Sequence, residues 1–288
     1  MLPEFELLLP GTLAEALEML AGGAPDVRPL AGGTNVIVEL RGRHRHYPVL
    51  MDVSRLPELR GIYRENGHVV VGGGTTIAEL LADPLVASYG LPLRDAAAVL
   101  GSPLVRNRAT LAGNLVDASP AADTAPPLLV LDAQVELVSR EGKRLLPLEE
   151  FIVGPNQTIL RPEELLLSVR WPVPPPGIAW AFHKIGLRNA LACSVVTAAV
   201  MVESDAGGRC RCARIALGAV APTPVRPHTA EEALRDQPLT PLLIAQAARH
   251  AAAATQPIDD VRASAAYRRR MAEVLVARLL DTAVGSKK

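Results

Sequence analysis

The sequence is poor in cysteine and has no excess of charge of either sign. Its 288 residues include three cysteines, Cys193, Cys210 and Cys212, which form neither a Cys-x-x-Cys pair nor an even disulfide set. The 30 basic residues balance the 30 acidic ones, so no net charge attracts nucleic acid or an anionic membrane. Apolar residues at 49% against 21% charged exclude a disordered chain. These values predict a globular protein in a reducing compartment, and we expect the cytoplasm.

Several targeting and binding segments are also missing. The first residues lack the basic and apolar stretches of a secretory leader, and the longest uncharged apolar run, 190–202, is too short to cross a bilayer. The one dense basic run, Arg41–His46, has no interleaved aromatic residues and is expected to be a solvated loop. Its His-x-His lacks a third metal ligand nearby. No Gly-x-Gly-x-x-Gly follows a strand and no P-loop occurs, which disfavours nicotinamide binding and P-loop hydrolysis.

The first 55 residues have the pattern of a small α/β unit. Thr12 and Glu15 form a predicted capping box for a helix that ends at Gly22-Gly23. The elements that follow are predicted to be a buried strand at Val27–Leu30, a helix from Val36 to Leu40 and a strand from Tyr47 to Val53.

Residues 56–171 are predicted to form an α+β domain. Asn66-Gly67 favours a tight hairpin, and Gly72–Thr76 is interpreted as a turn from strand to helix rather than a phosphate loop. The proline-rich run 172–177 is predicted to be a linker. Residues 178–288 should form a C-terminal domain with strands at Trp180–Ile185, Leu191–Val202 and Cys210–Ala219, then helices at Thr229–Arg235, Pro241–Ala254 and Ala263–Leu280.

Two glycine turns are the strongest candidates for a binding site. They are Leu30–Asn35 and Thr110–Asn114, about eighty residues apart. Neighbouring glycines let successive backbone N–H groups point into one concavity, which forms an anion site without a cationic side chain. One such turn is usually only structural. Two in one α+β chain favour a ligand with two phosphates.

The segment Ala118–Asp123, directly after the second turn, has two interpretations of equal weight. Ser119 or Asp123 provides an N-cap for a helix through Leu131. Alternatively, Asn114 and Asp123 lie near a polar ligand as amide and carboxylate partners.

Five runs, in order along nearly the whole chain, resemble the FAD-binding medium subunit of molybdenum hydroxylases. That family includes the medium subunit of carbon monoxide dehydrogenase and the flavin domain of xanthine dehydrogenase. The runs are Leu30–Asn35, Val105–Asn114, Ala118–Asp123, Phe182–Lys184 and Ser264–Arg268. The resemblance implies a two-subdomain FAD-binding fold of the vanillyl-alcohol-oxidase (PCMH) type, with a C-terminal domain that covers the cofactor and contains a three-stranded antiparallel sheet and helices.

The resemblance also implies a set of cofactor contacts. In the family, two loops hold the pyrophosphate and adjoining groups through backbone N–H contacts, and further positions approach the rest of FAD. The corresponding residues are Leu30, Ala31, Gly32, Gly33, Thr34, Asn35, Val36 and Ile37 in the first loop; Thr110, Leu111, Ala112, Gly113 and Asn114 in the second; and Leu100, Asp123, Leu166 and Lys184 elsewhere.

Two of these positions carry a structural alternative. Ala112 stands where the family has a second glycine, and it would be strained if the loop required a positive φ. Lys184 is either a cofactor contact or a strand-edge lysine on a wet face.

The resemblance implies an electron-transfer subunit with no catalytic acid or base and no metal of its own. A molybdenum-cofactor large subunit and a small subunit with [2Fe-2S] clusters would be its partners in a dimer of heterotrimers. Electrons would leave FAD to an external acceptor such as NAD or a quinone. The alternatives are a self-sufficient FAD-dependent reductase of the same fold and a scaffold subunit without flavin.

Overall fold

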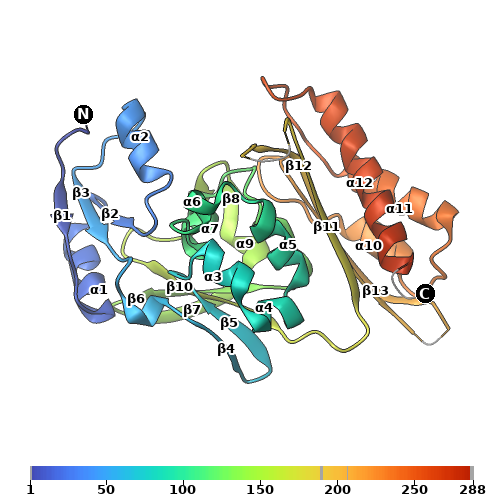
Figure 1. Ribbon diagram of the computed structural model, residues 1–288, viewed down its shortest axis with the longest axis horizontal. Coiled ribbons are helices and arrows are strands. Elements are labelled where there is room, and N and C mark those ends of the chain that lie inside the picture. The colour runs from blue at the N-terminus through green and yellow to red at the C-terminus, as the bar shows by residue number, and fades with distance from the viewer. Residues whose placement is uncertain (1, 189–190, 206, 286–288) are drawn as a thin grey trace.

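The computed structural model describes residues 2–188, 191–205 and 207–285, and its elements form three units side by side along the long axis (Figure 1). The N-terminal unit is a parallel sheet in the order β1-β3-β2 with two helices. Thr12 caps α1 as expected, but the Glu15 carboxylate accepts from the Gly11 N–H, so the reciprocal half of the capping box was wrong. The elements are β1 (Glu6–Leu8), α1 (Leu13–Gly23), β2 (Val27–Leu30), α2 (Val36–Gly42) and β3 (Val49–Asp52).

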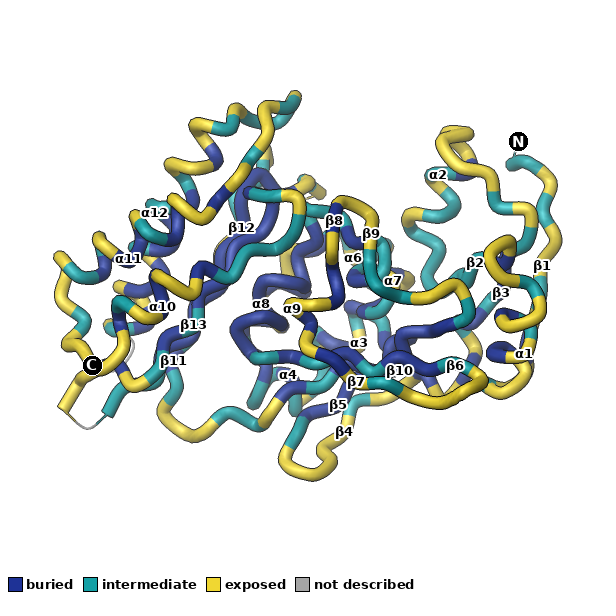
Figure 2. Tube along the Cα trace, turned by 180° about the vertical axis from the view of Figure 1, so that it is seen from behind, coloured by how far each residue is buried: buried dark blue, intermediate teal, exposed yellow. Residues whose placement is uncertain are grey.

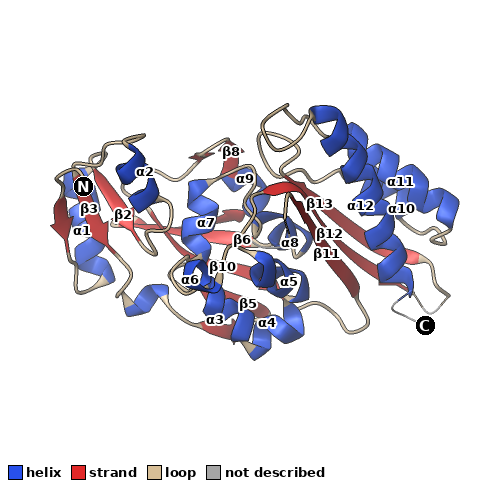
Figure 3. Cartoon of the chain, turned by 45° about the horizontal axis from the view of Figure 1, so that its top comes forward, coloured by secondary structure: helices blue, strands red, loops and turns tan. Residues whose placement is uncertain are grey.

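The middle unit is built on an antiparallel sheet in the order β4-β5-β10-β6-β7, with helices α3–α8 packed over it (Figure 3). The predicted hairpin at Asn66-Gly67 is confirmed, since Asn66 and Gly67 both adopt positive φ between β4 and β5. Its helices are η1 (Pro57–Leu59), α3 (Ile77–Ala82), α4 (Pro84–Tyr89), α5 (Leu91–Val99), α6 (Pro103–Arg106), α7 (Leu111–Asp117), α8 (Ala125–Val130) and α9 (Leu148–Phe151). Its strands are β4 (Ile62–Glu65), β5 (His68–Gly72), β6 (Gln134–Ser139), β7 (Gly142–Pro147), β8 (Ile152–Gly154), β9 (Gln157–Thr158) and β10 (Leu165–Pro172).

The C-terminal unit is a three-stranded antiparallel sheet in the order β11-β12-β13, with α10–α12 on one face (Figure 3). The central strand β12 is buried along most of its length, because the other face of the sheet packs on α5 and α8 of the middle unit (Figure 2). The elements are β11 (Ala179–Gly186), β12 (Ser194–Ser204), β13 (Cys210–Gly218), α10 (His228–Leu234), α11 (Pro241–Ala253) and α12 (Ala265–Gly285).

The α+β fold class with a three-stranded C-terminal sheet is confirmed. The predicted strand Leu191–Val202 was wrong at its start, because β12 begins at Ser194. The strand β10 runs through Pro172, the first residue of the predicted linker, and the divisions at 55, 171 and 177 stay predictions. None of the described helices meets the length and apolarity needed to span a membrane.

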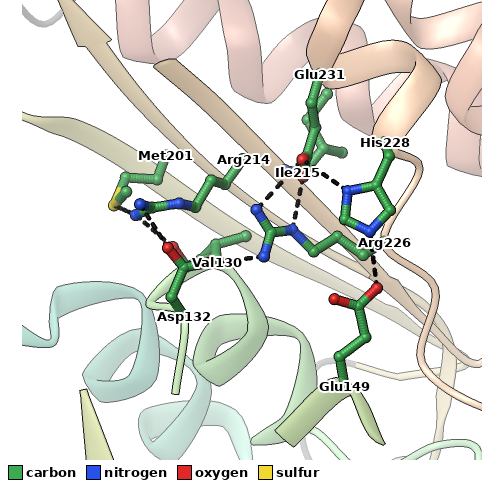
Figure 4. A network of polar contacts seen from close by, with 9 residues as sticks. All are labelled: Val130, Asp132, Glu149, Met201, Arg214, Ile215, Arg226, His228 and Glu231. Carbon is green, nitrogen blue, oxygen red and sulfur yellow. Dashed lines mark hydrogen bonds and ion pairs between the residues drawn. The ribbon is translucent and has the colours of Figure 1, made fainter. Parts of the chain in front are cut away.

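A network of ion pairs joins the middle and C-terminal units at one side of their contact (Figure 4). Asp132, at the end of α8, accepts from Arg214 at 2.5 Å and from Arg226 at 2.6 Å. Nearby, the Nε2 of His228 lies 2.8 Å from a carboxylate oxygen of Glu149. These contacts add polar links to the apolar contact between the two units.

Candidate cofactor site

A cavity of about 800 Å³ lies between the N-terminal and middle units. This volume is within the range of about 300–1,000 Å³ found for small-molecule and cofactor sites. Its wall is formed by the first glycine loop, by the second loop with α7, and by the segment from β8 to the start of β10. Among the described residues, none beyond Leu166 lines it, so the expected cover from the C-terminal domain is not part of this wall.

The first glycine loop presents unused backbone donors to this cavity. Gly32, Gly33, Thr34, Asn35 and Val36 all line it, and their N–H groups donate to no other described residue. Gly33 has a φ of 71°, a conformation that favours glycine and turns the chain into α2. The first loop thus lines the cavity with residues whose backbone N–H groups have no partner among the described residues, and its role as an anion site stays a prediction.

Gly32 packs closely against the backbone directly before the second loop. A Cβ at this position would lie 1.9 Å from the carbonyl oxygen of Arg108 and 3.0 Å from the N of Ala109. Only a residue without a side chain allows the two backbones to approach this closely.

The second loop is different, because the N–H groups of Leu111 to Asn114 are already bonded within the protein. Leu111 donates to Thr75 O at 3.0 Å, and Ala112 donates to Gly73 O at 2.9 Å. The N–H of Gly113 donates to the hydroxyl of Thr110 at 3.1 Å. Thr110 is the N-cap residue of α7. The expectation that both loops are open anion sites is therefore wrong for the second loop. The turn at Gly72–Thr76 has the structural role predicted for it, since its carbonyls receive two of these bonds.

Ala112 carries no strain. It is the second residue of α7 and is absent from the residues with positive φ, so the family's glycine is not needed there for conformation. Ala112 is one of the residues that line the cavity.

Asp123 and Lys184 form a buried ion pair behind the wall. Lys184 Nζ lies 2.5 Å from Asp123 Oδ2, and the Ser194 hydroxyl donates to Asp123 Oδ1 at 2.5 Å. The side chains of Lys184 and Asp123 are 8% and 7% exposed, so the wet-face interpretation of Lys184 was wrong. Burial raises the pKa of the Asp123 carboxyl above its ordinary value, while the Lys184 ammonium and the Ser194 hydroxyl act against that rise.

The N-cap interpretation of this segment was also wrong. The helix α8 begins at Ala125 with Thr124 at its N-cap position, and Thr124 donates to the side chain of Asn114 at 2.6 Å. The Ser119 hydroxyl accepts from the N–H of Ala121 within the loop and caps no helix.

The structure brings most of the predicted residues to one cavity. Those in its wall are Ala31, Gly32, Gly33, Thr34, Asn35, Val36, Leu100, Thr110, Ala112, Gly113, Asn114 and Leu166. The predicted residues outside the wall are Leu30, Ile37, Leu111, Asp123 and Lys184. Leu111 is fully buried, which fits a supporting role.

Three arginines in the wall were not predicted as site residues. The Arg28 guanidinium lies over the ring of Tyr47, 5.8 Å from its centroid. Arg45, from the run expected to be only a solvated loop, is exposed but also lines the cavity. Arg161 is in the wall near Glu164, whose carboxylate is held by Arg144 at 2.6 Å. Burial opposes ionisation of Glu164, but hydrogen bonds from Arg144 and the Arg161 N–H outweigh it and lower its pKa.

The cavity suits a phosphate-bearing ligand with a flat apolar part. Its wall combines N–H groups without partners among the described residues, arginines, and apolar side chains at Leu100, Val116 and Leu166.

Residues 3–174 match the family "FAD binding domain in molybdopterin dehydrogenase", and residues 180–283 match "CO dehydrogenase flavoprotein C-terminal domain". The chain therefore belongs to the FAD-binding subunits of molybdenum-containing hydroxylases, which confirms the resemblance, the oxidoreductase class and FAD as cofactor.

The sequences of individual relatives align with almost the whole of this chain. The carbon monoxide dehydrogenase medium chain of Hydrogenophaga pseudoflava is 32% identical over 98% of this chain and 97% of that protein. The xanthine dehydrogenase FAD-binding subunit of Escherichia coli O157:H7 is 31% identical over 96% and 94%. Among solved structures, a carbon monoxide dehydrogenase from Hydrogenophaga pseudoflava that lacks the Mo-pyranopterin moiety superposes with a TM-score of 0.95, at 32% identity and 98% coverage of both chains.

Proposed function

We propose that the 800 Å³ cavity is the FAD site and that this chain passes electrons from a partner's iron–sulfur clusters through FAD to an external acceptor. The observation that supports the location is that the N–H groups from Gly32 to Val36, in the cavity wall, have no partner in the part of the chain that the structure describes. Bound FAD would supply the redox chemistry, and the protein would orient it and set its potential.

The residues present fit the two ends of this cofactor. The N–H groups of the first loop and the guanidinium groups of Arg28 and Arg45 would bind the pyrophosphate. The side chain of Asn114 offers a hydrogen bond further along the wall, and Leu100 and Leu166 provide apolar surface for the ring system. The other predicted positions are proposed as supports of this wall, with Asp123 and Lys184 behind it near Leu100.

The partners and the location in the cell belong to the same proposal. The molybdenum cofactor would lie on a large subunit and the [2Fe-2S] clusters on a small subunit, since the three cysteines of this chain lack a cluster spacing. The relatives named as carbon monoxide and xanthine dehydrogenase subunits support this assembly. We propose a cytoplasmic dimer of heterotrimers with NAD, a quinone or another compound as acceptor.

The first experiment is to purify the full chain and measure its flavin by absorption and by fluorescence after release. A yellow protein with about one FAD per chain is expected, whereas a chain that takes up no FAD supports the flavin-free scaffold. Turnover of NADPH with a substrate by the isolated chain would support the self-sufficient reductase. Co-purification from the native source should recover two partner polypeptides, one with molybdenum and one with iron.

A further inference from the structure

The contact between the C-terminal unit and the end of the cavity is made by a small number of buried polar groups. The start of β12, the end of β13 and the segment Ala118–Asp123 meet there. We call this contact the joint and define it as Asp123, Lys184, Ser194 and Arg268. Each of these side chains is nearly or completely buried, so little water competes for its hydrogen bonds.

Ser194 connects the first residue of β12 to the middle unit. Its hydroxyl is fully buried and donates to Asp123 Oδ1 at 2.5 Å, across 71 residues of sequence. The other oxygen of Asp123 accepts from Lys184 on β11. Asp123 is thus held by two strands of the C-terminal sheet at once.

Arg268 fixes the position of β12 from the other side. Its guanidinium donates to the carbonyls of Val195 at 3.0 Å and Ala219 at 2.8 Å, and to Asp260 at 2.7 Å. The N–H of Ala219 in turn donates to Pro120 O at 2.8 Å. Arg268 therefore joins the residue next to Ser194 to the segment that contains Asp123.

Two further bonds extend from the joint to the cavity wall. Lys184 Nζ donates to the carbonyl of Val99 at 3.4 Å, and the next residue, Leu100, lines the cavity. Thr124, next to Asp123, donates to the side chain of Asn114, which also lines it. The C-terminal unit thus reaches the wall through the joint without contributing a lining residue among those described.

We infer that Ser194 and Arg268 are positioning residues for the FAD site: they hold the start of β12 against Asp123, so that Lys184 fixes Val99–Leu100 and Thr124 fixes Asn114. This inference rests on the proposed location of FAD. It adds a role for the Ser264–Arg268 run, whose arginine lies in the C-terminal helix α12.

The test is the dissociation constant of FAD, measured by flavin fluorescence on the full-length Ser194→Ala variant between pH 5.5 and 8. The lost hydrogen bond to a charged group should weaken FAD binding about tenfold, or roughly 1.4 kcal/mol. The loss should grow as the pH falls, because the Ser194 hydroxyl opposes the raised pKa of Asp123, and a protonated Asp123 no longer pairs with Lys184. Arg268→Lys should weaken binding in the same direction.

Two controls separate positioning from general loss of stability. Ser168→Ala removes a comparable bond from a buried serine to Glu136 in the middle sheet, and Asp132→Asn loosens the network of Figure 4. Both should keep FAD affinity within about twofold of the wild type, a free-energy change of roughly 0.4 kcal/mol. Unchanged affinity in Ser194→Ala, or equal losses in the controls, would overturn the inference. If Ser194→Ala does not fold, Ser194→Cys serves the same test. A wild-type chain that binds no FAD would instead overturn the proposed function.

Discussion

Replacing Gly32 by alanine should separate the two glycine loops. The added methyl group would lie 1.9 Å from Arg108 O and 2.5 Å from its carbonyl carbon, and both atoms belong to backbone that cannot rotate away. The first loop or the Arg108 backbone must then shift. Because the N–H groups of Gly33 to Val36, which have no partner among the described residues, lie on this loop, their movement changes the proposed phosphate site directly.

The expected effect follows from the cost of overpacking. Forcing an extra methyl group into a packed site costs about 1–3 kcal/mol. If that free energy is lost from FAD binding because the N–H donors are displaced, the dissociation constant of FAD rises about 5- to 150-fold. Fluorescence titration of the apoprotein with FAD measures this change, and urea denaturation of the same sample gives the free energy of unfolding.

Gly22→Ala is the matched control for Gly32→Ala. A Cβ at Gly22, in the last turn of α1, meets nothing within 4 Å, so alanine should leave FAD binding unchanged and stabilise the fold by up to about 1 kcal/mol. A Gly32→Ala protein that binds FAD as tightly as the wild type would refute the assignment of the first loop as the phosphate site.

Three further predictions concern single positions. Gly33→Ala, at a φ of 71°, should lower the free energy of unfolding by about 1–2 kcal/mol in urea denaturation, and Gly33→Asn by less; equal losses would contradict a conformational cause. Ala112→Gly should lower the free energy of unfolding by about 0.5–1 kcal/mol and leave FAD affinity unchanged, because the alanine is unstrained in α7. Improved FAD retention would contradict this prediction. The hydrogen bond that His228 donates to the Glu149 carboxylate raises the pKa of His228, so the folded state binds that proton more tightly than the unfolded chain. This contribution, at most about 1 kcal/mol for an exposed pair, is complete below pH 6.5 and is lost as the pH rises through the folded-state pKa. Glu149→Gln should flatten the stability profile between pH 6 and 8, and an unchanged profile would exclude the pair as its source.

Local sequence signals were sufficient for the elements that position the site. Apolar spacing and capping residues located the helices after Thr12 and Thr76, and Asn66-Gly67 located the hairpin. These signals depend only on residues that are close together in the sequence, so the sequence alone is enough to recognise them. The start of β12 was misplaced because Leu191 to Cys193 are as apolar as the strand that follows.

The difference between the two glycine loops could not be predicted in the same way. Both are short turns that contain glycine and lead into a helix, and glycine shows only that the backbone has room. Whether a backbone N–H group is free depends on acceptors that are distant in the sequence. The carbonyls of Gly73 and Thr75, which accept from the second loop, belong to a turn nearly forty residues earlier. The Asp123–Lys184 pair spans 61 residues, so its burial also depends on how the units pack.

The two loops and the joint therefore divide the site into three tasks. The first loop has N–H donors without partners among the described residues and is suited to bind phosphate, whereas the N–H groups of Leu111 to Asn114 in the second loop are bonded internally. Gly32 packs against the backbone directly before the second loop. The joint holds the far end of the cavity wall from behind, through Val99 and Thr124. A substitution in the first loop should consequently remove binding energy for the phosphates, while one in the joint should change the fit of the ring end, although neither Ser194 nor Arg268 lines the cavity.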